Sequence, residues 1–109
     1  MAAIIEVHTT IDSREVAQKI AEAIVSKRLA ACVQVSGPIT STYWWEGKVE
    51  QAEEWVCTMK TRKALFNELE RAIKAEHTYD VPEIVATPII TGSQSYLTWI
   101  EHETSAPTI

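Results

Sequence analysis

The first part of the chain alternates apolar and polar positions in a way that predicts a strand followed by a helix. Residues 3–9 are largely apolar and β-branched, as in a strand with buried faces. Apolar side chains then recur at helical spacing, with lysine and glutamate between them. We expect Asp12 or Ser13 to cap the start of this amphipathic helix and Arg28 to lie near its end.

The middle of the chain has the pattern of a long hairpin. Residues 31–45 are rich in strand-forming side chains, and Gly37-Pro38 interrupts them, which predicts a bend or bulge rather than a stop. A turn containing Gly47 follows, and residues 49–60 alternate as the returning strand. Its glutamates are interpreted as a charged strand edge: Glu50, Glu53 and Glu54.

The last third predicts a helix, a strand and a short helix. Thr61 is the expected cap of the second helix, whose apolar side chains are spaced by four and which ends near His77. Residues 84–90 have the pattern of another buried strand, and Ser93 can cap the short helix that follows. Residues 104–109 are expected to form a tail.

Taken together, the elements run strand, helix, strand, strand, helix, strand and short helix. Two strand-helix-strand units in tandem predict an α+β, ferredoxin-like sandwich, with both main helices on one face of an antiparallel sheet. No linker or low-complexity segment interrupts the chain, so residues 1–109 are expected to form a single domain.

Charge and composition narrow the classes of partner. Ten Lys and Arg against fifteen Asp and Glu give a net charge of -5, which disfavours a nucleic acid. No apolar run reaches the roughly 20 residues of a membrane span, and the first residues lack the basic start of a signal peptide. Cys32 and Cys57 form no CxxC motif, so we expect reduced thiols and a cytoplasmic protein.

The hairpin is the feature that predicts self-association. At about 3.3 Å per residue, residues 31–45 would span roughly 50 Å, whereas a domain of this size has a radius of gyration of about 13 Å. The arm would expose a group of large aromatic side chains: Tyr43, Trp44, Trp45 and Trp55. A neighbouring chain could bury them. The alternative is that the arm folds back on its own sheet.

Three stretches in this order resemble the signature blocks of the divalent-cation tolerance (CutA) family. They are residues 29–33 (LAACV), 43–48 (YWWEGK) and 77–84 (HTYDVPEI). The resemblance implies a ferredoxin-like fold and a tight homotrimer similar to the nitrogen-signalling PII trimers. Thr78 departs from the pattern, since the family usually has proline there.

The same resemblance implies binding of copper or another divalent cation. We expect His77 and Glu83 of the third block to be ligands, followed by His8 and then Cys32, because imidazole, thiolate and carboxylate suit copper. No HxH, HExxH or CxxC spacing supports a site by itself. The alternatives are a surface or interface role for His8, a packed thiol for Cys32, a helix-end role for His77 and a loop contact for Glu83.

A ligand-sensing or scaffold trimer is the second hypothesis. No GxSxG, P-loop or dinucleotide motif is present, so we expect no enzymatic activity. The PII-like assembly implied by the resemblance would place clefts between subunits. The expected lining of such a cleft is Tyr43, Trp45, Lys60, Tyr79 and Glu83. Lys60 and Arg62 could then receive an anion, or these groups could simply hold the trimer together.

Overall fold

The structure, a computed structural model, describes residues 2–105. The elements occur in the predicted order, with a 3₁₀ turn added before the second helix. They are β1 (Ile4–Ile11), α1 (Arg14–Ser26), β2 (Cys32–Trp45), β3 (Lys48–Arg62), η1 (Lys63–Leu65), α2 (Phe66–Glu76), β4 (Ile84–Pro88) and α3 (Gln94–Ser105).

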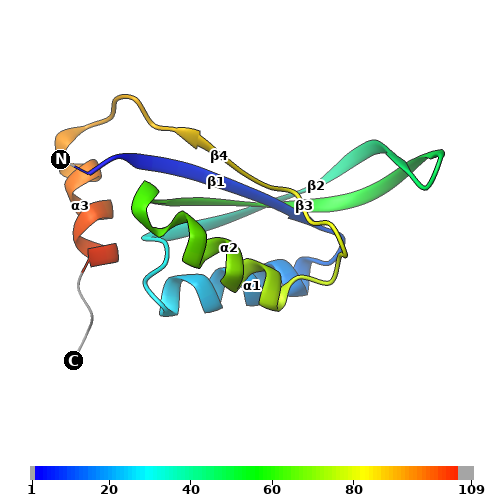
Figure 1. Cartoon of the computed structure of the whole chain (residues 1–109), viewed down its shortest axis with the longest axis horizontal. Coiled ribbons are helices and arrows are strands. Elements are labelled where there is room, and N and C mark those ends of the chain that lie inside the picture. The colour runs from blue at the N-terminus through cyan, green and yellow to red at the C-terminus, as the bar shows by residue number, and fades with distance from the viewer. Residues whose placement is uncertain (1, 106–109) are drawn as a thin grey trace.

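The four strands form one antiparallel sheet with the order β2-β3-β1-β4. Figure 1 shows α1 and α2 lying together on one face of this sheet, while α3 lies at the end remote from the hairpin tip. The fold is therefore the mixed α+β arrangement that the sequence predicted, with a four-stranded antiparallel sheet and three helices.

The core lies between the sheet and the two helices. Its fully buried members come from both layers: Val7, Ile11, Cys57 and Met59 from the strands, and Ile20, Ile24, Leu69 and Ile73 from the helices. Each buried side chain of this size stabilises the fold by about 1.5–3 kcal/mol. Side chains alternate along a strand, so Glu6 and His8 lie on the opposite face, which α1 and α2 leave uncovered. We call this surface the open face.

The cap of α1 is Ser13, one of the two residues that the sequence offered. Its Oγ accepts a hydrogen bond from the backbone N–H of Val16 at 3.2 Å. The helix ends at Ser26, two residues before the expected end, and Arg28 follows in the left-handed region with φ 57°. The turn into β2 therefore begins slightly earlier than the pattern indicated.

The prediction that Thr61 caps the second helix is wrong. Thr61 is a buried residue of β3, and its hydroxyl donates a 2.7 Å hydrogen bond to the carbonyl of Leu29. The strand continues to Arg62, and α2 begins only at Phe66, without a side-chain cap. A threonine that packs inside a sheet and one that caps a helix look the same in a local pattern.

Two further expectations near the end of the chain need correction. The predicted buried strand over residues 84–90 ends at Pro88, and its residues are mostly exposed because β4 is an edge strand with no helix over its outer side. Thr104 is not part of a tail, because it is a buried residue of α3. The rest of the predicted tail, residues 106–109, lies outside the described residues.

The β2–β3 hairpin extends past the ends of α1 and α2 (Figure 1). Its interruption is a bulge, as predicted: the pairing shifts between Ser36 and Ile39, while β2 continues. Gly37 has φ +142°, and a Cβ there would lie 2.9 Å from the carbonyl oxygen of Glu54. One expectation fails, since Trp55 packs against the core instead of joining the aromatic side chains of the arm.

Candidate functional site

A cleft of about 720 Å³ lies between the hairpin and the loop that follows α2. Its walls combine aromatic side chains, carboxylates and small polar groups. The lining residues are Thr10, Ser41, Thr42, Tyr43, Trp44, Trp45, Glu54, Tyr79, Asp80, Val81, Pro82 and Glu83. Four of the five residues expected to share a cleft therefore do so within a single chain. Lys60 is not among them.

His77 fixes the loop that forms one wall of the cleft. Its Nδ1 accepts a hydrogen bond from the backbone N–H of Tyr79 at 3.1 Å, so the ring proton lies on Nε2. Nε2 then donates to the carbonyl of Thr10, 2.8 Å away. The ring also packs edge-on against that of Tyr79, with centroids 4.7 Å apart. Both ring nitrogens of His77 are therefore occupied by contacts that connect the loop to β1.

Tyr79 and Glu54 form the polar contact at the base of the cleft. The Tyr79 hydroxyl donates to Glu54 Oε2 at 2.7 Å, and Glu54 is only 6% exposed. Burial raises the pKa of Tyr79 well above its ordinary value, and the hydrogen bond to Glu54 and the charge of that carboxylate raise it further. The phenol is therefore a hydrogen-bond donor over the whole neutral range.

Glu54 is the residue of this site that the sequence interpretation missed. It was grouped with Glu50 and Glu53 as a charged strand edge, and for Glu54 this is wrong. Alternation along β3 places Glu54 on the same face as Val56, opposite the core-facing Trp55, so the local pattern by itself predicts an exposed side chain. The partner, Tyr79, lies far along the chain, so its contact could not be read from local spacing.

The remaining predicted residues lie on the open face, apart from the cleft. His8 Nε2 is 3.1 Å from Glu6 Oε1, and Lys60 Nζ lies 3.6 Å from Glu6 Oε2. Lys60 also donates to Gln34 at 3.1 Å. Cys32, at the start of β2, has its Sγ 3.6 Å from the hydroxyl of Tyr96. The predicted metal ligands are thus distributed over two separate places.

The geometry of one chain does not provide a metal centre from these residues. In residues 2–105, no group of three or more His, Cys, Asp or Glu side chains is close enough to hold a metal ion. His77, the first expected ligand, could coordinate a metal only by giving up one of its two hydrogen bonds. The described residues 2–105 of one chain therefore do not fit copper in this arrangement, and a site built from them would need ligands from another copy or a change in the loop.

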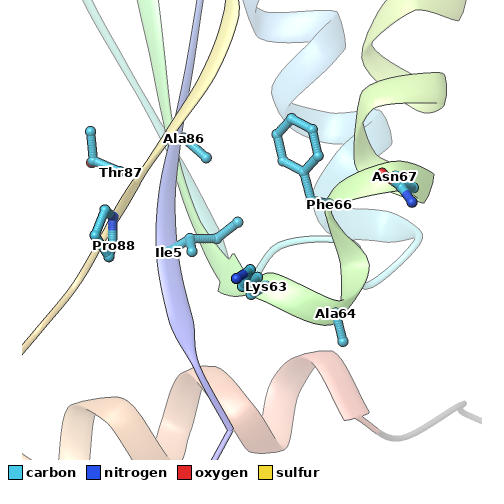
Figure 2. A pocket seen from close by; sticks show the side chains of 8 residues that line it. All are labelled: Ile5, Lys63, Ala64, Phe66, Asn67, Ala86, Thr87 and Pro88. Atoms are coloured by element: carbon cyan, nitrogen blue, oxygen red, sulfur yellow. The ribbon is translucent and has the colours of Figure 1, made fainter.

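A second hollow, of about 520 Å³, lies at the other end of the sheet beside β4 (Figure 2). Figure 2 shows apolar side chains from β1, α2 and β4 around it, with Lys63 and Asn67 as its longer polar groups. Its lining includes none of the predicted site residues and no carboxylate. This hollow is therefore less suited than the cleft to polar recognition.

No helix within the described residues 2–105 is both long enough and apolar enough to cross a membrane.

Comparison with known proteins identifies the family. The family model described as CutA1 divalent ion tolerance protein matches residues 5–103. The divalent-cation tolerance protein CutA of Thermus thermophilus is 45% identical over 95 residues, which cover 87% of this chain and 92% of that protein. Two chloroplastic CutA proteins, from rice and Arabidopsis thaliana, are 43% and 44% identical over 100 residues. The match covers 92% of this chain but only 56% and 55% of theirs, so the chain spans about half their length.

Solved structures agree with this result. The cation tolerance protein of Thermus thermophilus superimposes with a TM-score of 0.91 at 43% identity, covering 94% of this chain and 99% of that one. CutA1 from rice gives 0.93 at 40% identity and covers 97% of both chains. The sequence resemblance to this family is therefore confirmed in both sequence and fold, and the chain belongs to the CutA1 divalent ion tolerance family.

Proposed function

We propose that this chain assembles as a homotrimer, PII-like in arrangement, that takes part in divalent-cation tolerance and binds copper. The observation that carries the assembly is the amount of apolar surface that one chain leaves uncovered. Trp44 is 74% exposed on the arm and Val85 is 47% exposed on the open face. Apolar patches of this kind mark surfaces that another protein covers.

The proposed copper site is shared between chains, because one chain does not bring its ligands together. His77 remains the first candidate ligand, followed by Glu83, His8 and Cys32. Imidazole, carboxylate and thiolate are donors that suit copper. Glu83 is exposed at the mouth of the cleft, which leaves its carboxylate available to a second chain.

A copper titration by calorimetry, with the mass of the assembly measured by light scattering, tests this proposal. Three chains per particle and saturable binding of about one ion per chain are expected, with binding lost in His77→Ala and Glu83→Ala. His102→Ala and Glu76→Ala are matched controls, since both residues are exposed and neither lines the cleft. Weak copper binding that is the same in all four variants would contradict the proposed copper site. A monomeric mass by light scattering would contradict the proposed assembly.

The cleft favours a second candidate function, which is the binding of a small molecule in a sensing or scaffold role. A volume of about 720 Å³ is in the range of small-molecule sites, and aromatic walls provide contact area. We propose a non-catalytic role, in line with a sequence that carries no nucleophile motif. A cytoplasmic location is proposed as well, because Cys32 and Cys57 are both free thiols.

A further inference from the structure

The loop that follows α2, residues 77–83, is held in place by two side chains. It has no regular secondary structure, and within the described part of the chain its side-chain hydrogen bonds are made by His77 and Tyr79. Glu83, at the far end of the loop, takes part in none of the ion pairs of the described residues. The position of its carboxylate therefore depends on how firmly His77 and Tyr79 fix the loop.

His77 contacts β1 at the point where the ladder with β4 stops. The last pair of that ladder is Thr9 with Ile84, so the carbonyl of Thr10 lies one residue beyond it. Thr10 is only 9% exposed, and the imidazole Nε2 donates to its carbonyl at 2.8 Å. A buried carbonyl without a donor is unfavourable, and His77 supplies the donor that no strand provides here.

The other ring nitrogen makes a contact that is common in turns. Nδ1 of His77 accepts a hydrogen bond from the backbone N–H of Tyr79, two residues further on, at 3.1 Å. Asparagine and aspartate make the same contact in Asx turns, where a side-chain oxygen accepts from the N–H two residues later. An imidazole adds a second nitrogen on the opposite side of the ring, which reaches Thr10. Histidine is therefore suited to joining this loop to β1 without a metal ion.

A metal ion would compete with both contacts of the ring. Imidazole coordinates metals through an unprotonated nitrogen, but Nδ1 is the acceptor for Tyr79 and Nε2 carries the proton donated to Thr10. Coordination would therefore release one end of this connection, and the described residues gather no set of further ligands that would compensate. This geometry disagrees with the expectation that His77 is the first ligand.

We infer that His77 is a positioning residue of the loop and not a metal ligand. It acts on cation binding through Glu83, because the loop that carries this carboxylate is fastened to β1 by the imidazole. The inference rests on the proposed divalent-cation role and changes the part that His77 plays in it. A ligand and a positioning residue both predict weaker copper binding in His77→Ala, so that variant alone does not distinguish them.

The substitution His77→Asn distinguishes the two roles. The asparagine side-chain oxygen can accept the N–H of Tyr79, but the imidazole nitrogens that suit copper are gone. Amide hydrogen exchange should show that the Tyr79 N–H loses about tenfold or more of its protection in His77→Ala and at most about threefold in His77→Asn. The amides of α1 should keep their protection in both variants, which checks that each variant folds.

Calorimetry with copper(II) ions as the only addition measures the effect on binding. His77→Asn should bind copper to within about threefold of the wild type, whereas His77→Ala should bind about tenfold more weakly or worse. His102→Asn is the matched control, because it also replaces an imidazole by an amide, at an exposed position that does not line the cleft. The control should leave both copper affinity and the protection of Tyr79 unchanged.

Three outcomes would overturn the inference. Loss of copper binding in His77→Asn while Tyr79 stays protected would show that the imidazole is a ligand. Full protection of Tyr79 in His77→Ala would show that the loop needs no anchor at this position. Equal loss of that protection in both variants, with α1 intact, would show that the contact at Nδ1 does not fix the loop.

Failure of the proposed copper role has a different signature. If the wild type binds no copper, the proposed metal function is rejected, while hydrogen exchange in the two variants still supports or overturns the anchoring role of His77.

Discussion

Tyr79 shows how a single side chain can connect the stability of the fold to the chemistry of the cleft. Its hydroxyl satisfies a buried carboxylate, its backbone N–H satisfies a ring nitrogen of His77, and its ring packs on that imidazole. The loop wall therefore depends on contacts with β1 and β3 and not on its own turn residues. Thr78 is exposed and lies between these two anchored residues.

The pH dependence of stability tests this contact through Tyr79→Phe. The substitution should cost about 1–3 kcal/mol at neutral pH, because it leaves Glu54 buried without a donor. Above pH 10 the phenol ionises in the unfolded chain, while its raised pKa keeps it protonated in the folded one, so rising pH favours unfolding. The wild-type advantage should therefore shrink as pH rises beyond about 10.

Urea unfolding of both proteins across the alkaline range measures this difference. Tyr43→Phe is the control, since Tyr43 lines the same cleft and is exposed; its change should stay within about 0.5 kcal/mol. A difference between wild type and Tyr79→Phe that is constant up to pH 12 would contradict the buried contact.

At single positions, the side-chain contacts that could be predicted from the sequence are those between residues close together in the chain. Ser13 was recognisable as a helix cap because its partner, the N–H of Val16, lies three residues away. Thr61 was misplaced because its partner, the carbonyl of Leu29, lies on a distant turn. Glu54 resembles Thr61 in this respect, because its partner, the phenol of Tyr79, is also distant in sequence and no neighbouring residue indicates it.

At the scale of elements, α3 is joined to the rest of the fold by two arginines. The Arg62 guanidinium donates to the hydroxyl of Thr104 at 3.0 Å and to its carbonyl at 2.8 Å. Arg28 donates to the carbonyl of Glu103 at 3.0 Å and forms a salt bridge with its carboxylate. Both place positive charge at the C-terminus of the helix, where unpaired carbonyls and the helix dipole attract it.

Arg62→Ala should therefore loosen α3 while the sheet remains intact. Hydrogen exchange should show the amides of α3 losing about 1–3 kcal/mol of protection, and those of β1 should keep theirs. Arg71→Ala is the control, because Arg71 is exposed on α2. Equal loss of protection in β1 and α3 would mean that α3 unfolds together with the sheet and not as a separate unit.

Hydrophobic periodicity predicted the order and type of the elements, because each strand and helix has its own apolar pattern. Their ends were less predictable. The last turn of α3, which ends at Ser105, includes Thr104, and the contact of Thr104 with Arg62 joins distant parts of the chain. The exposure of β4 follows from its place at the sheet edge, and Val85 looks the same in sequence whether or not a neighbour covers it.

For the molecule as a whole, residues that the resemblance implied for a cleft between subunits line a hollow within one chain, whereas the expected metal ligands lie apart. Tyr43, Trp45, Tyr79 and Glu83 meet because the hairpin and the loop after α2 lie at the same end of the sheet. The metal hypothesis came from the resemblance alone and had no spacing motif behind it. Its four expected ligands divide between the cleft region and the open face, so one chain does not bring them together.

Assembly through the open face should make stability depend on concentration. When unfolding also separates subunits, a higher protein concentration favours the folded assembly. A rise in concentration of about 100-fold should therefore raise the midpoint of thermal unfolding. Val85→Lys places a charge on the open face and should lower both the midpoint and the mass of the assembly.

Val25→Lys is the matched control, because Val25 is 40% exposed and Val85 is 47% exposed, but Val25 lies on α1 on the other side of the sheet. Light scattering and calorimetry at two concentrations measure both effects. If Val25→Lys and Val85→Lys reduce the mass of the assembly equally, the helices also contribute to the interface. If neither substitution reduces the mass, the exposed arm alone must hold the chains together. A midpoint of thermal unfolding that does not change with concentration would contradict the assembly itself. It would show that unfolding separates no subunits and that a single chain folds with this apolar surface exposed to water.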